Sequence, residues 1–178
     1  MKSPLSSSPM NAYISLGSNL GDRAGNLLLA VRGMLEAGLA VNRLSSIYET
    51  EAMTKISHEV ASELPPFLNM VAELRTPLPA PEQLLARLLR IEFALGRTRE
   101  TPGGPRTIDL DLLLCGNQTR ATEYLTLPHP RLHVRRFVLA PLAELAPQVM
   151  HPTLQRSASE LLTALTDNAK VERWLRSN

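Results

Sequence analysis

Two aspartates separated by one residue stand in the chemically most informative stretch of the sequence. The run TIDLDLLL at 107–114 alternates apolar residues with Asp109 and Asp111. Side chains along a β-strand point alternately to opposite faces. The run therefore predicts a strand with both carboxylates on one face, and with an apolar core face made of Ile108, Leu110, Leu112 and Leu114.

A purely structural strand would avoid this pair of acids. The two Cα atoms are expected roughly 6.5 Å apart, where ionised carboxylates repel by about 2–3 kcal/mol at an effective dielectric constant of about 20. A divalent cation reverses the sign of that interaction, and Mg²⁺ typically binds through one or two carboxylates together with substrate phosphates. Asp109 and Asp111 are thus candidate metal ligands. The alternatives are an exposed pair on an open sheet face, or a pair neutralised by nearby arginines.

A basic loop directly precedes the aspartates. Arg97, Arg99 and Arg106 lie in or beside a segment that contains two glycines and a proline at 103–105. Arginines next to a carboxylate-bound cation favour phosphoryl transfer, because they stabilise charge that shifts during the reaction while closure of a loop excludes water.

The distribution of charge agrees with an anionic partner. The chain has 19 Lys and Arg against 17 Asp and Glu, and sixteen of the cations are arginines. Nine arginines lie between Arg87 and Arg136 against five acidic residues, a local balance of +4. The planar guanidinium suits phosphate and carboxylate. The partner could be a phosphorylated small molecule or a nucleic acid, and a solvated basic face is the third interpretation.

The elements that must position these residues alternate between strands and helices. Strand-like runs lie at 12–16, 41–50, 67–74 and 107–115. Helical patterns lie at 22–38, 81–96, 137–146, 159–165 and 171–176, and Phe93, inside the second of these, is expected in the core. A long polar loop is expected at 51–66. This order predicts an α+β fold, a two-layer sandwich in which helices pack on one face of the sheet and the other face stays available.

The remaining features predict a single domain. Residues 1–11 are rich in Ser and Pro and are expected to be a disordered N-terminal extension, with Met10 as the natural start, and 12–178 form one domain. No apolar run approaches the roughly 18 residues of a membrane span. The single Cys115 excludes an internal disulfide. One thiol and no recognisable secretion signal favour the cytoplasm.

Six blocks, in order, carry a resemblance to a known family. They are GSNLGD at 17–22, YET at 48–50, FLN at 67–69, RIE with GRTR at 90–99, GPRTIDLD at 104–111, and PHP at 128–130 followed by Arg135 and Phe137. Between about residues 12 and 152 the chain resembles the 6-hydroxymethyl-7,8-dihydropterin pyrophosphokinases of folate biosynthesis. These enzymes transfer pyrophosphate from ATP to a pterin alcohol.

The resemblance implies a ferredoxin-like fold and a set of site residues. Asp109 and Asp111 would hold two Mg²⁺ ions. Arg97 and Arg106 would act on the triphosphate, with Asp109 nearest the nucleophile. ATP contacts are implied for Glu92, Arg97, Arg99, Leu112, Thr126, His129 and Arg135. Pterin contacts are implied for Phe67 and Phe137, which would stack on the ring, and for Asn69 and the backbone near Thr50.

Two other functions remain open from the sequence. An arginine-rich, non-catalytic RNA-binding module could share this fold, although aromatic residues make up only 4% of the chain and the free sheet face would carry two carboxylates. A homologue with lost or altered pterin activity is the second alternative, because EAMT at 51–54 replaces the proline and glycine that usually follow Thr50 in the family. We expect a monomer that binds small-molecule substrates, without a nucleic-acid or membrane partner.

Overall fold

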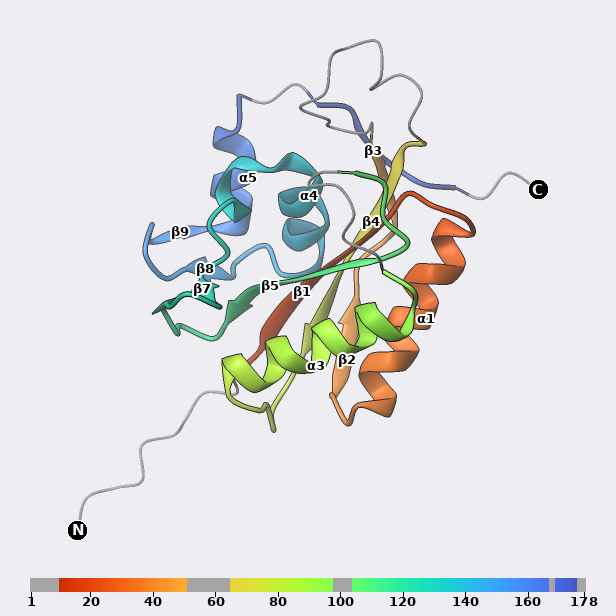
Figure 1. The fold of residues 1–178 in the computed structure, drawn as a ribbon. Helices are drawn as coiled ribbons and strands as arrows, with labels where there is room; N and C mark the ends of the chain where they lie inside the picture. The colour runs from red at the N-terminus through yellow and green to blue at the C-terminus, as the bar shows by residue number, and fades with distance from the viewer. Residues whose placement is uncertain (1–9, 51–64, 98–103, 167–168, 176–178) are drawn as a thin grey trace.

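A six-stranded antiparallel sheet lies at the centre of the protein. The computed structural model describes residues 10–50, 65–97, 104–166 and 169–175. The strands are β1 (Ala12–Ser18), β2 (Val41–Leu44), β3 (Tyr48–Thr50), β4 (Phe67–Leu74), β5 (Asp109–Cys115) and β10 (Val171–Arg173). Their order is β10-β3-β4-β1-β5, and β2 also pairs with β4 (Figure 1).

Two helices cover the first face of the sheet. They are α1 (Arg23–Glu36), which follows β1, and α3 (Pro81–Ala94), which follows β4. The Asp22 side chain caps α1 by accepting a hydrogen bond from the Gly25 N–H, and proline at the first position of α3 fits a helix start. With β3 and β5 these elements make a β-α-β-β-α-β unit, which confirms the predicted α+β, ferredoxin-like fold.

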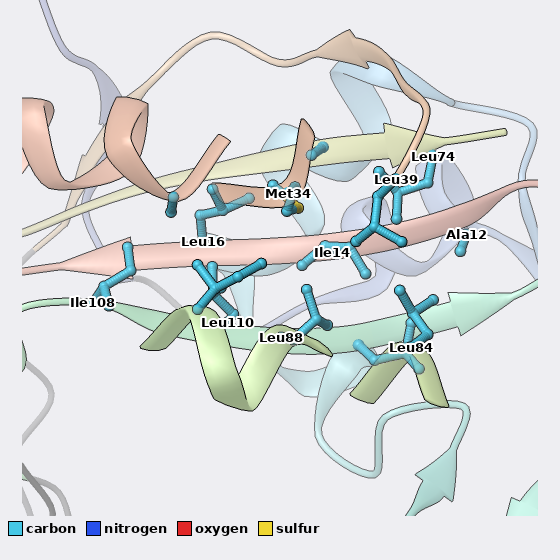
Figure 2. Packing of buried hydrophobic residues seen from close by; sticks show 14 of the residues in the cluster. Ala12, Ile14, Leu16, Met34, Leu39, Leu74, Leu84, Leu88, Ile108 and Leu110 are labelled. Carbon is cyan, nitrogen blue, oxygen red and sulfur yellow. The ribbon is translucent and has the colours of Figure 1, made fainter. Parts of the chain in front are cut away.

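The core between this face and the two helices is apolar and close-packed. Figure 2 shows side chains of β1, β5, α1 and α3 meeting in one cluster, among them Leu16, Met34 and Leu88. Each of these three residues is fully buried. Burial of a leucine or methionine side chain stabilises a protein by roughly 1.5–3 kcal/mol, so this layer fixes β1 and β5, the strands from which the aspartates and the β1–α1 turn project.

The second face of the sheet is also covered along part of its length. Helices α4 (Arg136–Leu145) and α5 (Ala158–Ala164) lie on this side (Figure 1). Val71 of β4 and Leu113 of β5 pack there against Leu139 and Leu142 of α4. The expectation that helices pack on one face only is therefore wrong. The second face of β4 carries the apolar Phe67 and Val71, and exposing these side chains to water would be unfavourable.

A β-bulge in β5 changes the face that its last residues occupy. Tyr13 pairs with Leu114 but the next residue of β1, Ile14, pairs with Leu112, so Leu113 is an extra residue. Leu113 and Leu114 consequently belong to the second-face cluster, whereas Leu112 belongs to the first. The prediction that Leu114 shares the core face is wrong, because a bulge resets the alternation of side chains.

Three further expectations differ from the structure. The predicted strand at 41–50 is two strands, β2 and β3. The predicted terminal helix at 171–176 is instead the strand β10, which pairs with β3. Phe93, expected in the core, is 82% exposed on α3. The proposed extension falls largely on residues 1–9 and the long loop on 51–64, and both segments lie outside the described residues.

Small elements complete the part of the chain that the structure describes. They are the pairs β6 (Arg120–Ala121) with β7 (Thr126–Leu127) and β8 (Met150–His151) with β9 (Arg156–Ser157), and the 3₁₀ turn Leu132–Val134. No helix in the described ranges is both long and apolar enough to span a bilayer.

A buried carboxylate holds together the end of the sheet remote from the aspartates. Glu73, 1% exposed, accepts hydrogen bonds from Tyr13 Oη at 3.0 Å, Asn42 Nδ2 at 2.5 Å and Arg43 Nη2 at 2.6 Å. Burial alone would raise the pKa of Glu73, but the hydrogen bonds from these three side chains outweigh it and hold that pKa below its ordinary value.

We expect Glu73→Gln to lower the free energy of unfolding by about 1–3 kcal/mol at neutral pH, because charge-assisted hydrogen bonds are lost at a buried site. A depressed carboxyl pKa contributes stability above the unfolded-state pKa of about 4.3, and this contribution is lost as the pH falls through the folded-state pKa. Urea unfolding at neutral and acidic pH should therefore show the difference between variant and wild type shrinking in acid. A constant difference would contradict the assignment.

Candidate active site

One end of the second face carries a row of three positions across the sheet. Gly17 of β1 pairs with Asn69 of β4 on one side and with Asp109 of β5 on the other. Neighbouring strands are about 4.8 Å apart, so the Cα atoms of Asn69 and Asp109 are separated by about 10 Å. Gly17 is buried and has no side chain, so no Cβ lies between the Asn69 amide and the Asp109 carboxylate on this face.

The structure brings Asp109 together with the predicted arginines. Arg97 Nη2 lies 2.8 Å from Asp109 Oδ1, and Arg106 Nη1 forms an ion pair with Asp109 Oδ2. Arg97 also forms an ion pair with Glu92, whose Oε1 accepts a hydrogen bond of 2.7 Å from the Leu110 N–H. The alternative of an arginine-neutralised carboxylate is therefore found at Asp109.

Asp111 lies on the same face and is less tightly paired. Its Oδ2 is 3.8 Å from both His129 Nε2 and Arg135 Nη1. Burial, and after it the nearby Asp109 carboxylate, raise the pKa of Asp111 above its ordinary value. This direction is the one expected from two like charges held on one strand face. The predicted orientation of both aspartates away from the first-face core is confirmed.

His129 is held as a neutral donor beside the carboxylates. Its Nδ1 accepts a hydrogen bond from the Arg131 N–H at 3.2 Å, which leaves the proton on Nε2. Burial, followed by the charges of Arg135 and Arg131, lowers the pKa of His129 to about 4. At neutral pH the Nε2–H is thus available to donate to an oxygen anion next to Asp111.

The carboxylate pair fits a hard cation that keeps ligands of its own. Within the described ranges, no group of three or more His, Cys, Asp and Glu side chains could hold a metal ion. A cation held by Asp109 and Asp111 alone would take further ligands from water or from a substrate. Mg²⁺ binds in this way in nucleotide sites, so the chemistry of these donors suits magnesium with a bound triphosphate.

The opposite end of the row is suited to a flat polar ligand. Asn69 is 3% exposed, and its Nδ2 donates to Thr50 Oγ1 at 2.9 Å. Phe67, two residues before Asn69 on the same strand face, is half-buried. Phe137 lies in the first turn of α4, packed against the second-face cluster, and the guanidinium carbon of Arg135 is 5.4 Å from its ring centroid.

Of the remaining predicted residues, two lie away from the ion-paired cluster and a third is not described by the structure. Leu112 is 3% exposed and its side chain belongs to the first-face core, so that only its backbone could contact a ligand. Thr126 is exposed in β7. Arg99 lies outside the described residues.

Reasoning from the sequence missed two polar residues after β1. The turn between β1 and α1 contains Asn19, for which the sequence suggested no partner; it is 1% exposed, and its Oδ1 accepts a hydrogen bond from the Arg106 N–H. Arg23 forms an ion pair with Glu49. The one signal in the sequence was the presence of amide and small polar residues directly at the end of a buried strand.

The fold and this cluster define a class of protein. Two aspartates beside several arginines and a neutral histidine, on an α+β domain, are typical of enzymes that transfer phosphoryl groups. The model of the family "7,8-dihydro-6-hydroxymethylpterin-pyrophosphokinase (HPPK)" matches residues 13–147. The chain belongs to this family, as the resemblance of its sequence blocks predicted.

Relatives support the assignment along most of the chain. The 2-amino-4-hydroxy-6-hydroxymethyldihydropteridine pyrophosphokinase of Bacillus subtilis is 44% identical over 164 residues, covering 92% of this chain and 89% of the relative. The protein of the same name from Aquifex aeolicus is 36% identical, covering 83% of this chain and 88% of the relative.

Solved structures show the same fold. A wild-type Plasmodium falciparum HPPK-DHPS structure with pteroate matches with a TM-score of 0.65 at 16% identity, over 88% of this chain. The chain spans 42% of the length of that solved protein. At this identity the likeness concerns the fold alone.

Proposed function

We propose that the protein transfers pyrophosphate from ATP to the hydroxymethyl group of 6-hydroxymethyl-7,8-dihydropterin, forming the pterin diphosphate and AMP in folate biosynthesis. The row of Asn69, Gly17 and Asp109 carries the proposal, because the register sets a buried amide and a carboxylate on one sheet face with their Cα atoms about 10 Å apart, a spacing that would suit a polar heterocycle beside a bound cation. Membership of the family and the names of the relatives support the choice of substrate.

The nucleotide would bind on the side of β5. Asp109 and Asp111 would hold two Mg²⁺ ions, which neutralise phosphate charge when bound. Arg97 and Arg106, now paired with Asp109, would turn to the triphosphate. We assign the remaining ATP contacts to Glu92, Arg99, the backbone of Leu112, Thr126, His129 and Arg135.

The pterin would bind on the side of β4. Its ring would stack between Phe67 and Phe137, an arrangement that suits offset aromatic contacts. The Asn69 amide and the backbone near Thr50 would read the polar edge of the ring. The absence of a side chain at Gly17 would let the hydroxymethyl group reach toward the phosphates.

The reaction is an in-line displacement. The hydroxymethyl oxygen forms a bond to the β-phosphorus while the bond from that phosphorus to the α,β-bridging oxygen breaks, and AMP leaves with the bridging oxygen. The hydroxyl proton is lost to a water molecule on the side of Asp109. The protein contributes position and charge stabilisation, without a covalent intermediate.

The identity of the nucleotide product tests the proposal directly. Incubation with Mg²⁺, ATP and the pterin alcohol should yield AMP in a one-to-one ratio with pterin diphosphate. Formation of ADP would indicate an ordinary kinase. No turnover, with intact binding of an ATP analogue, would favour the homologue with altered pterin activity.

The protein is further proposed to act as a cytoplasmic monomer without a nucleic-acid partner. The carboxylates on the open part of the sheet would repel a phosphate backbone, which argues against the RNA-binding alternative. A gel-shift assay over a series of salt concentrations should show no RNA binding. An RNA-binding module would instead bind with the steep salt dependence that phosphate contacts produce.

Gly17→Ala should raise the KM for the pterin by about 10-fold or more while the KM for ATP stays nearly constant. A Cβ at Gly17 would lie 3.1 Å from Asn69 Oδ1 and 3.8 Å from the Phe67 ring. The buried Asn69 amide, which donates to Thr50, would have to shift by a few tenths of an ångström. One misplaced methyl in a substrate pocket typically costs a factor of 10–200. Steady-state kinetics with each substrate varied in turn measures the effect. An unchanged pterin KM would contradict the place of Gly17 in the pterin site.

A further inference from the structure

The turn between β1 and α1 is hydrogen-bonded to the phosphate side of the site. The Asn19 N–H donates to the Arg106 carbonyl at 3.1 Å, and the Arg106 N–H donates to Asn19 Oδ1 at 2.7 Å. Asn19 is 1% exposed. These two bonds fix the backbone from which the Arg106 side chain reaches Asp109.

The same turn is bonded to the pterin side. Arg23, the first residue of α1, donates from Nη1 to the Pro66 carbonyl at 2.7 Å and to Glu49 Oε1 at 2.8 Å. Pro66 immediately precedes Phe67, and Glu49 immediately precedes Thr50. One guanidinium therefore joins the adjacent ends of β3 and β4. The Asn19 amide adds a longer hydrogen bond of 3.4 Å from Nδ2 to the Pro65 carbonyl.

Internal contacts make the turn a rigid connection between the two sides. Asn26 Nδ2 donates to the Leu20 carbonyl at 2.8 Å and to Ser18 Oγ at 3.2 Å. Gly21 has a φ of +61°, a conformation that glycine adopts without strain. The Asp22 side chain accepts the Gly25 N–H at 3.0 Å, a bond at the start of α1 that joins neither side of the site.

We propose that Asn19 and Arg23 are positioning residues that hold the pterin-binding strand ends and Arg106 in one fixed geometry. This inference rests on the proposed function. The attacking oxygen and the phosphorus must approach to about 3–3.5 Å, and a displacement of about 1 Å can cost a factor of 10² in rate. Asn19 acts through Arg106 and Pro65, and Arg23 acts through Glu49 and Pro66.

Asn19 offers two substitutions that separate its roles. Asn19→Ala removes both side-chain bonds and should lower kcat by about 10-fold to 100-fold. Asn19→Asp keeps an acceptor for the Arg106 N–H but places an oxygen against the Pro65 carbonyl, so it should spare the phosphate side and raise the pterin KM. Asp22→Ala, which loses only the helix cap, is the matched control and should retain kcat.

Arg23 has a control on its own helix. Arg23→Gln should raise the pterin KM by about 10-fold and leave the KM for ATP unchanged, because its bonds go to the β3 and β4 ends. Arg32→Gln removes an exposed ion pair with Glu36 on α1 and should change neither constant. Equal effects of the two substitutions would overturn the role of Arg23.

Amide hydrogen exchange tests the connection whether or not AMP is formed. In Asn19→Ala the Arg106 amide and the amides at 67–70 should exchange faster, whereas in Asp22→Ala the increase should stay within α1. In Asn19→Asp only the amides at 67–70 should respond. Exchange confined to α1 in all three variants would overturn the proposal. Absence of AMP with the wild type would instead refute the proposed reaction.

A double-mutant cycle gives a second criterion. Because Asn19 is proposed to act on the rate through Arg106, adding Asn19→Ala to Arg106→Ala should lower kcat by less than about 3-fold. Full additivity of the two losses would show that the turn affects the rate by another route and would overturn this part of the proposal.

Discussion

Asp109→Asn and Asp111→Asn should each lower the rate of AMP formation by at least about 10³-fold while the protein remains folded. Asparagine has nearly the shape of aspartate but supplies one neutral oxygen in place of a charged pair. A divalent cation that stabilises transferring phosphoryl oxygens contributes several kcal/mol to catalysis, and each factor of 10³ in rate corresponds to about 4 kcal/mol. Rapid-quench or steady-state measurement of AMP across a Mg²⁺ titration provides the test.

Asp22→Asn is the matched control for these variants. Asp22 is an exposed carboxylate whose substitution also removes one negative charge, and asparagine caps helices about as well as aspartate. It should retain wild-type activity. If Asp111→Asn kept more than about a tenth of the wild-type rate at saturating Mg²⁺, the assignment of this carboxylate to the cation site would be wrong.

Stability should respond to the Asp111 substitution in the opposite direction to activity. The pKa of Asp111 is raised by burial and by Asp109, so its ionised form is disfavoured in the folded state. The resulting destabilisation is absent below the unfolded-state pKa of about 3.9 and fully present above the raised folded-state pKa. Asp111→Asn should therefore unfold at an equal or higher temperature at neutral pH, and any gain should disappear in acid.

The central part of the site could be read from the sequence because it depends on local geometry. The alternation around Asp109 and Asp111 determines which face of β5 they occupy, and no information about neighbouring strands is needed. Arg106 is three residues from Asp109, so its proximity follows from the chain itself. The structure confirms both placements.

Features that depend on a distant partner could not be read in this way. The bulge at Leu113 arises from the pairing of β5 with β1, about 100 residues earlier, and it moves Leu114 to the second face. The segment at 171–173 becomes a strand because β3 offers an unpaired edge. Phe93 was expected in the core only because it is aromatic and lies inside a helix, whereas the helical period puts it opposite Leu84 and Leu88, which face the first-face core.

The polar residues of the β1–α1 turn show the same limit. Asn19 is typical of a turn, and its type gives no indication that Arg106, 87 positions later, is its partner. The row of Asn69, Gly17 and Asp109 likewise exists only in the register of three strands. The sequence therefore predicts the groups that could do the chemistry, while the sheet determines the distance between them.

Arg106→Ala should lower kcat by about 10²-fold to 10³-fold with a smaller change in the KM for ATP. Arg106 forms an ion pair with one carboxylate oxygen of Asp109, and Arg97 forms an ion pair with the other. Loss of Arg106 is therefore tolerable for the fold, whereas an arginine that stabilises the charge of a phosphoryl transition state is worth about 10³-fold or more in related chemistry. Single-turnover kinetics at saturating substrates measures the step directly.

A comparison of Arg106→Lys with Arg106→Ala separates the effect of the positive charge from that of the guanidinium geometry. Arg106→Lys keeps a cation but loses the planar pair of donors, so its rate should fall between those of wild type and Arg106→Ala. Arg120→Ala removes a cation of similar exposure that pairs with Glu82 far from the aspartates, and it should leave kcat unchanged. If Arg120→Ala and Arg106→Ala slowed the reaction equally, the effect would reflect the overall charge of the basic region, and Arg106 would have no specific part in the transfer.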